Sequence, residues 1–249
     1  LPKSLKQSDL DTKASYRQIL KATSVFGGVQ VFQILINILR SKIIALWLGP
    51  AGMGIYGLYT STITLVSNVS AMGLGVSAVK NIAAAFASGD SEKAGRVVKV
   101  LRVLVWVTGL AGSLFVFLFA RRLSLFTFGV PDHHVGFMWI SATLLFNQIS
   151  SGQLALLRGA RKVKHLASAG LSGSLVGLVV SVPLYYYWGV DGIVPAIVVT
   201  SVASLFRSWY FARKVKVPAA TITRHDLKSE GTDMLRMGFM LGLSSILVS

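Results

Sequence analysis

The sequence predicts an all-α, polytopic membrane protein. Hydrophobic residues make up 53% of its 249 residues, and only 14% are charged, whereas soluble domains carry about 25% charged residues. The charge deficit is concentrated in long runs without any charged side chain, which is the pattern that a bilayer selects. Lysine and arginine gather in alternate connections between these runs, as in membrane proteins with a fixed orientation.

The first uncharged run extends over residues 43–79. It is too long for a single crossing, which takes about 20 residues. The sequence Gly-Pro-Ala-Gly at 49–52 interrupts it and is a strong turn signal. Two helices are therefore expected to meet at this turn, over residues 22–48 and 53–79.

Four further hydrophobic stretches follow. Aromatic side chains such as Tyr185, Trp188 and Trp209 lie near their ends, as in the aromatic belts of membrane proteins. The predicted helices cover residues 96–120, 135–157, 166–188 and 190–212. Together with the first two they form a six-helix transmembrane lobe over residues 22–213.

Polar segments flank this lobe. Residues 1–21 lack the hydrophobic core of a signal peptide and are predicted to be a cytoplasmic N-terminal segment. Residues 214–236 are predicted to be a cytoplasmic linker. A seventh helix is expected to start at 237–249, where the sequence stops in the middle of a span. We therefore expect a longer chain, of which this sequence is the N-terminal lobe of a two-lobe exporter plus the start of helix 7.

The basic residues predict the orientation. With a cytoplasmic N-terminus, the inner segments would be residues 1–21, 80–102, 158–165 and 207–236. These segments hold 21 of the 25 lysines and arginines, whereas the outer loops hold Arg121 and Arg122. Because positive residues are retained on the cytoplasmic side, the N-terminus is predicted to be cytoplasmic. The same asymmetry accounts for the net charge of +16 without a nucleic-acid partner.

Composition excludes several kinds of chemistry. The sequence contains no cysteine, which excludes disulfides, thiolate metal sites and a cysteine nucleophile. All nine acidic residues lie outside the uncharged runs on which the predicted spans are based, with Asp191 at the outer end of the last span. Asp132, His133 and His134 are adjacent in an outer loop, but a metal site needs further ligands, and a solvated loop is the preferred interpretation. We expect no catalytic residue, metal or cofactor.

Three segments together resemble a known family. Residues 39–57 read LRSKIIALWLGPAGMGIYG, residues 157–164 read LRGARKVK, and residues 188–196 read WGVDGIVPA. They resemble the O-antigen and enterobacterial-common-antigen translocases of the polysaccharide transporter family, within the multidrug/oligosaccharidyl-lipid/polysaccharide exporter superfamily. The resemblance covers the chain from about residue 15, and the LGPAG turn is its most specific element.

The resemblance implies two helical lobes around a central cavity. It implies a flippase that moves an undecaprenyl-pyrophosphate-linked oligosaccharide, such as an O-antigen unit, across the bacterial inner membrane by alternating access. The implied partners are the lipid-linked oligosaccharide and membrane lipids, together with a polysaccharide polymerase and a chain-length regulator of the same pathway. An enzymatic activity is not implied.

The first predicted helix carries a polar stripe. Gln30, Gln33, Asn37 and Arg40 fall within an arc of about 80°, and such a stripe faces a cavity or another helix rather than lipid. A guanidinium can bind a pyrophosphate bidentately, so Arg40 is the leading candidate for this role. The alternative is structural, with Arg40 capping carbonyls or reaching outward. Lys42 points about 160° away and is a secondary candidate.

Polar residues on two other predicted helices complete the candidate site. They could bind sugar hydroxyls, although small polar side chains also hold membrane helices together. The basic cluster at 158–164 could gather anionic substrate or simply set the topology. The predicted substrate-binding residues are Arg40, Asn37, Gln33, Gln30, Asn147 and Arg158, with Lys42, Thr64, Asn68 and Ser151 as secondary candidates.

The sequence also allows two alternative functions. A cation-coupled multidrug exporter of the same superfamily would bind cationic drugs and would usually need acidic residues within the spans, which this lobe lacks. A membrane glycosyltransferase or polymerase would need clustered acidic or basic catalysts in a sizeable loop, and the predicted loops are short.

Overall fold

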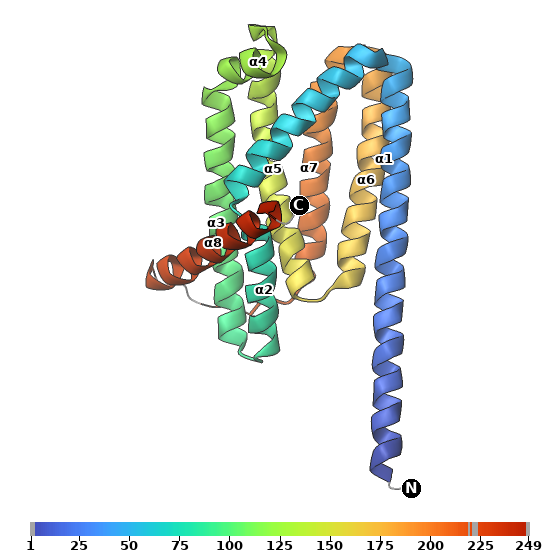
Figure 1. Ribbon diagram of the computed structural model, residues 1–249, viewed down its shortest axis with the longest axis vertical. Helices are drawn as coiled ribbons and strands as arrows, with labels where there is room; N and C mark the ends of the chain where they lie inside the picture. The colour runs from blue at the N-terminus through green and yellow to red at the C-terminus, as the bar shows by residue number, and fades with distance from the viewer. Residues whose placement is uncertain (1–2, 219, 221–223, 248–249) are drawn as a thin grey trace.

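The computed structural model describes residues 3–218, 220 and 224–247, and these residues form a helical bundle without strands. The helices are α1 (Lys3–Ala71), α2 (Leu74–Ala87), α3 (Ser91–Leu118), α4 (Ala120–Phe128), α5 (His134–Gly159), α6 (Val163–Trp188), α7 (Ile193–Ala212) and α8 (Arg224–Leu247). Short 3-10 turns, η1 (Pro131–His133) and η2 (Gly189–Gly192), precede α5 and α7. The expected all-α, polytopic fold is confirmed (Figure 1).

Helix α1 consists of two helices that meet at a sharp bend. At Gly49 the backbone has φ 67° and ψ −171°, in the left-handed half of the map that residues with a Cβ avoid. Pro50 follows as the first residue of the second half, where its missing N–H costs no helical hydrogen bond. Figure 1 shows the first half rising from the N-terminus and the second half returning obliquely. The reversal lies within the turn predicted at 49–52.

The helix predicted over residues 53–79 is replaced by two helices. After Ala71, Met72 and Gly73 have φ values of 45° and 69°, and two successive residues with positive φ cannot continue a right-handed helix. Glycine suits the second position because a Cβ there would collide with the backbone carbonyl of Gly238 in α8. The break is thus linked to the packing of α8.

Other boundaries also differ from the predicted ones. Helix α3 begins at Ser91 rather than 96, because the Asp90 side chain accepts a hydrogen bond of 3.0 Å from the backbone N–H of Lys93 and caps the helix. The predicted outer loop at 121–134 contains α4 and η1. Helix α8 begins at Arg224, so the second part of the predicted linker is helical.

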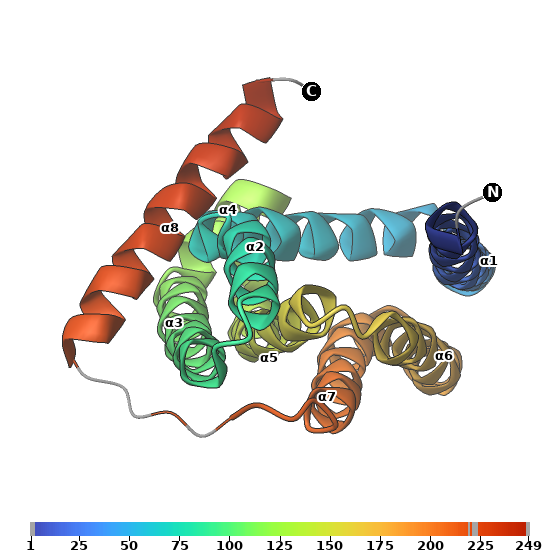
Figure 2. The same ribbon diagram turned by 90° about the horizontal axis from the view of Figure 1, so that it is seen from below.

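Two buried apolar clusters hold the bundle together, one toward each end. One includes Ile82 of α2 and Leu157 of α5, and the other includes Ile44 of α1, Phe137 of α5 and Ile193 of α7. Helix α5 contributes to both clusters and contacts both α3 and α7. It is therefore the central helix of the lobe, as Figure 2 also shows.

Three apolar segments are long enough to cross a membrane by length and composition: Gly27–Ala71, Ser91–Leu118 and Val163–Ala212. The first and third contain 45 and 50 residues, whereas one crossing takes about 20. The first reverses at Gly49, and the third is interrupted by η2. Each therefore provides two helices of spanning length, and the chain is a multi-pass membrane protein.

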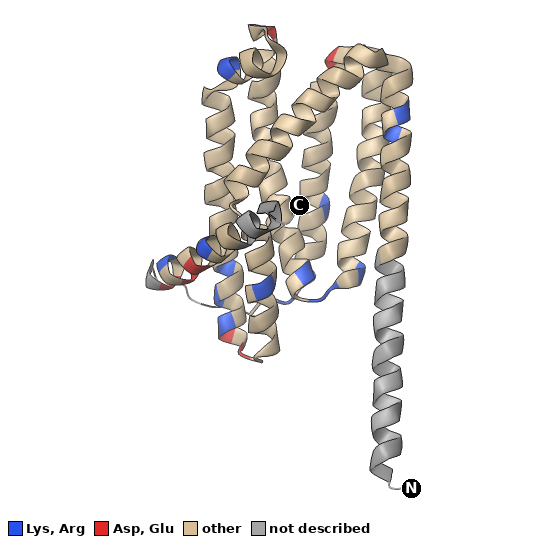
Figure 3. Ribbon diagram, viewed as in Figure 1, with Lys and Arg blue, Asp and Glu red and all other residues tan. Residues whose placement is uncertain are grey.

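Basic residues gather at one end of the bundle. Figure 3 shows lysine and arginine mainly at the end of α2, α3, α5 and α6 that lies toward the N-terminus, with few at the end that carries α4. This distribution is the spatial counterpart of the alternation seen in the sequence. The basic end is the one that we expect to face the cytoplasm.

Pro218 and Ala220, which follow α7, lie against the first turns of α3. Lys99 Nζ donates a hydrogen bond to the carbonyl of Ala220, and a Cβ on Gly95 would lie 2.5 Å from the carbonyl oxygen of Pro218. Helix α8 then packs against α2 and α3. Burial raises the pKa of Glu230 on α8 above its ordinary 4.5, and the nearby Arg96 of α3 opposes this effect.

We predict that Glu230 makes the stability of the protein depend on pH. Because its pKa is raised in the folded state, its contribution to stability is favourable below its ordinary pKa and is lost as the pH rises through the raised value. Glu230→Gln keeps the shape and cannot ionise. The variant should have a higher melting temperature than the wild type at pH 7.5, and the difference should vanish toward pH 4. The prediction would be contradicted if the melting temperatures of the two proteins changed with pH in parallel.

The orientation can be tested with single cysteines, because the sequence contains none of its own. Ser88 lies at the basic end and Asp132 at the opposite end, and both side chains are exposed. A membrane-impermeant maleimide added to spheroplasts should label Asp132→Cys and not Ser88→Cys. In inside-out vesicles the pattern should reverse. The opposite pattern in either preparation would mean that the N-terminus lies outside.

Candidate functional site

A small polar pocket lies inside the lobe, between the two halves of α1 and the helices α5 and α7. Its volume is about 190 Å³. Among the described residues that line it, Arg40 is the charged one and none is Asp or Glu. The residues that form it are Arg40, Tyr56, Thr60, Ile63, Thr64, Thr143, Asn147, Ile197, Thr200, Ser201 and Ser204.

Arg40 reaches the pocket from the first half of α1, roughly 13 Å along the helix from the bend at Gly49. Its Nη2 donates a hydrogen bond of 3.0 Å to Thr200 Oγ1 and a longer one, 3.4 Å, to the carbonyl oxygen of Gly177. Its Nε is buried and has no hydrogen-bond partner. The guanidinium is thus held in place by α6 and α7, and one of its donors is buried without a partner.

Glycine at position 177 makes room for this arrangement. A Cβ there would lie 2.8 Å from Thr200 Cγ2 and 3.8 Å from Arg40 Nη2. The first distance is too short for ordinary packing, so α6 and α7 can approach this closely only because Gly177 has no side chain. The approach places the Gly177 carbonyl within reach of the guanidinium.

Three of the predicted site residues come together here. They are Arg40 of the first half of α1, Thr64 of the second half, and Asn147 of α5, and Thr60 lines the pocket one turn before Thr64. The hydroxyls of Thr60 and Thr64 donate to backbone carbonyls one turn earlier in their own helix, each at 2.8 Å. Their oxygens remain able to accept hydrogen bonds from a ligand.

The rest of the predicted polar stripe does not line the pocket. Gln33 packs against α6, where a Cβ on Gly170 would collide with its amide nitrogen. Gln30 and Asn37 are exposed on α1. The stripe is wider than the contact that this half of α1 makes with α6, so only Arg40 reaches the pocket.

The remaining candidates also lie elsewhere. Arg158 is exposed at the C-terminal end of α5, at the basic end of the bundle. Ser151 lies near α2, with its Oγ 3.9 Å from where a Cβ on Gly75 would be. Lys42 and Asn68 are exposed and do not line the pocket.

Sequence reasoning missed several polar groups of the pocket. Thr143 of α5 is almost completely buried, and its hydroxyl oxygen has no hydrogen-bond partner. Thr200 and Ser204 of α7 are four residues apart, as Thr143 and Asn147 are on α5, and this spacing puts each pair on one face of its helix. The spacing of four residues within each pair was the signal in the sequence that could have identified these residues. The buried hydroxyl of Tyr185 also lacks a hydrogen-bond partner.

The outer-loop histidines are engaged in local packing. His134 Nδ1 lies 2.8 Å from the carbonyl oxygen of Pro131, and the His133 ring lies 4.2 Å from that of Phe128. Within the described part of the chain, no group of three His, Cys, Asp or Glu side chains is placed to hold a metal ion.

We predict that Gly177→Ala disturbs the site through packing. The added methyl group would press on Thr200 and force α6 and α7 apart or Thr200 out of its rotamer, a type of overpacking that costs about 1–3 kcal/mol. The expected result is a lower melting temperature in detergent. Gly57→Ala is the matched control, because nothing lies within 4 Å of a Cβ there. Equal melting temperatures for the two variants would show that the contact is not tight.

Comparison with known proteins places the chain in a family. A family model described as polysaccharide biosynthesis protein matches residues 19–249. No curated protein gives a significant match. Among solved structures, a mutant MATE protein aligns with a TM-score of 0.71 at 22% identity, covering 91% of this chain and 53% of its own.

Two further structures share the fold. An outward-facing multidrug resistance MATE family transporter of the MOP superfamily aligns with a TM-score of 0.70 at 22% identity, covering 89% of this chain and 50% of its own. An inward-facing one aligns with a TM-score of 0.64 at 20% identity, covering 85% and 50%. The chain thus spans about half the length of these structures. It belongs to the polysaccharide biosynthesis protein family and shares its helical fold with these MATE structures.

Proposed function

We propose that the protein is a flippase, which moves an undecaprenyl-pyrophosphate-linked oligosaccharide such as an O-antigen unit across the bacterial inner membrane. The observation that carries this proposal is the Arg40 pocket. It offers one cation among neutral hydroxyl and amide groups inside a membrane lobe, and intramembrane charges of this kind mark substrate pathways.

The chemistry of the pocket suits a sugar pyrophosphate. The guanidinium of Arg40 lines the pocket, and a guanidinium binds phosphate more strongly than a neutral donor does. The hydroxyl groups of Thr64 and Ser204 and the amide of Asn147 offer hydrogen-bonding partners for sugar hydroxyls. Because these donors and acceptors can bind the hydroxyl groups of many sugars, we propose a substrate class and not a particular sugar.

The membership in the polysaccharide biosynthesis protein family supports the same class of cargo. In the proposed cycle, the headgroup enters the pocket from the basic end, the prenyl chain stays in the lipid, and rocking of two lobes exposes the pocket outward. This proposal includes a cytoplasmic N-terminus. It also includes a polysaccharide polymerase and a chain-length regulator as partners in the pathway.

A multidrug exporter is the second candidate, because the solved structures that share the fold include multidrug resistance MATE family transporters. The charge of the pocket separates the two functions. A positively charged pocket repels cationic drugs and attracts an anionic headgroup. Catalysis has less support, since the described residues place no acid–base pair or metal ligands in the pocket.

The experiment is flipping of a fluorescent undecaprenyl-pyrophosphate-linked sugar in proteoliposomes, with the full-length protein. Arg40→Ala should slow flipping by about 10- to 100-fold, because a hydrogen bond to a charged group contributes roughly 1.5–3 kcal/mol. Lys42→Ala is the matched control, since this exposed cation lies two residues away and outside the pocket. It should flip at the wild-type rate.

The possible results distinguish the functions. Flipping by wild type and Lys42→Ala with loss in Arg40→Ala supports both the flippase and the role of Arg40. If Arg40→Ala flips normally, Arg40 has a structural role only. If the wild type flips no lipid-linked sugar and instead exports cationic dyes, the protein is a drug exporter.

A further inference from the structure

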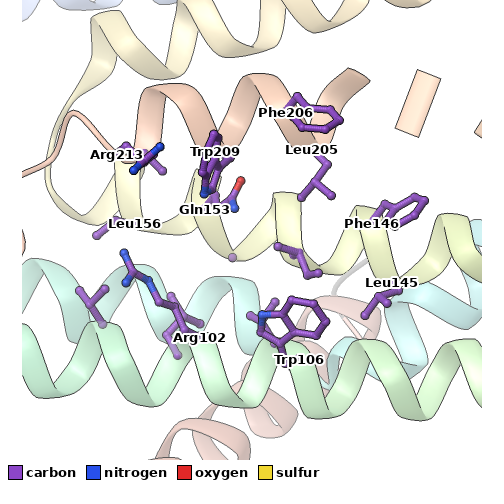
Figure 4. Close-up of a pocket in the computed structure, with 16 residues that line it drawn as sticks. Arg102, Trp106, Leu145, Phe146, Gln153, Leu156, Leu205, Phe206, Trp209 and Arg213 are labelled. Carbon is purple, nitrogen blue, oxygen red and sulfur yellow. The ribbon is translucent and has the colours of Figure 1, made fainter. Parts of the chain in front are cut away.

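A second cavity lies on the other side of α5, between α3, α5 and α7. Its volume is about 550 Å³, and it shares no lining residue with the Arg40 pocket. Its walls are largely apolar and aromatic, with Trp106 of α3, Phe146 of α5, and Phe206 and Trp209 of α7 (Figure 4). Trp106 and Trp209 are 50% and 46% exposed, so the cavity is a groove that opens to the surroundings of the lobe.

One end of this groove is basic. Figure 4 shows Arg102 of α3 and Arg213, just after α7, at the same end of the groove and on opposite walls. The guanidinium of Arg213 lies 4.3 Å from the centre of the Trp209 ring, a cation–π contact that fixes its direction. Among the described residues, no carboxylate forms an ion pair with Arg102 or Arg213, so neither groove arginine is neutralised.

The basic end of the groove lies at the level expected for the inner-leaflet lipid headgroups. Arg213 follows the C-terminal end of α7, and Arg102 lies in the half of α3 that starts at the basic end of the bundle. This is where the inner-leaflet headgroups would lie in the predicted orientation, and the cytoplasmic leaflet is the one that carries anionic lipids. Tryptophan prefers the same interfacial level.

We propose that the groove binds an anionic phospholipid of the cytoplasmic leaflet. The lipid phosphate lies between Arg102 and Arg213, and one acyl chain runs along the groove past Trp106, Phe146 and Phe206. The volume falls within the roughly 300–1,000 Å³ typical of small-molecule sites. The lining combines an apolar channel with two cations at one end, which matches the two parts of such a lipid and not a soluble anion. The proposal does not depend on the transported substrate.

The two tryptophans of the groove provide the readout. The other three, Trp47, Trp139 and Trp188, are replaced by Phe in the full-length protein, so that emission comes from Trp106 and Trp209 within this chain. Any tryptophan elsewhere in the full-length protein is replaced in the same way. The protein is titrated in detergent with phosphatidylglycerol or phosphatidylcholine whose acyl chains carry bromine, which quenches tryptophan on contact.

In the background with the groove tryptophans alone, the anionic lipid should quench at a concentration about 20-fold lower than the zwitterionic lipid. The choline ammonium cancels the phosphate charge of the zwitterionic lipid, whereas each Arg gains roughly 1 kcal/mol, about fivefold, from a lipid with net negative charge. Arg102→Gln combined with Arg213→Gln should abolish the preference. Arg121→Gln combined with Arg122→Gln is the matched control, because these exposed arginines belong to α4, which lies at the opposite end of the bundle (Figure 1). This control should keep the preference.

Two results would overturn the proposal: equal quenching by the two lipids in the parent protein, or a preference that survives loss of both groove arginines. Millimolar inorganic phosphate is also added as a competitor. If it displaces the anionic lipid at a concentration equal to that of the lipid, the groove binds a free anion, and this result would also overturn the proposal. If the double variant does not fold, Arg102→Lys and Arg213→Lys can replace it. These substitutions keep the positive charge and should keep part of the preference for the anionic lipid. The comparison of the two lipids in the parent protein still tests the proposal.

Discussion

The structure depends on one constraint, which is that backbone N–H and C=O groups cannot be left unpaired in a hydrocarbon environment. Helices satisfy these groups internally, and irregular backbone is tolerated only where protein covers it. The reversal at Gly49 lies at the end of the lobe. The break at Met72 and Gly73 lies deeper, and there α8 approaches so closely that Gly73 and Gly238 have no space for side chains. Helix α8 is therefore part of what makes the break in the second crossing possible.

The features of the fold that sequence could predict are those whose cause is local. Gly49 and Pro50 force a reversal whatever surrounds them, so the turn was visible in the sequence. The break at Met72 and Gly73 depends on contact with α8, more than 150 residues later in the chain. The pattern of hydrophobic residues does not indicate this contact. The start of α3 was misplaced for a different reason. Asp90 is a good helix cap, but the prediction followed the hydrophobic boundary and not the cap.

The residues of the candidate site also fall into those that the sequence could predict and those that it could not. Arg40 and Asn147 stood out because strongly polar side chains are rare in membrane helices, and both line the pocket. Thr200 and Ser204 line it too, but small hydroxyls also serve as ordinary contacts between membrane helices, and polarity alone could not single them out. Gln33 shares a helix face with Arg40 and yet packs on Gly170. A stripe on one helix does not reveal how much of it a neighbouring helix covers.

The single positive charge of the pocket has an energetic consequence for the proposed cargo. A pyrophosphate carries more negative charge than Arg40 can balance, so the occupied pocket of this lobe keeps a net negative charge. A membrane potential that is negative inside drives such a charge outward, by about 2.3 kcal/mol for each elementary charge per 100 mV. The resting voltage of the cell could thus supply part of the work of export without a proton-carrying carboxylate among the described residues that line the pocket.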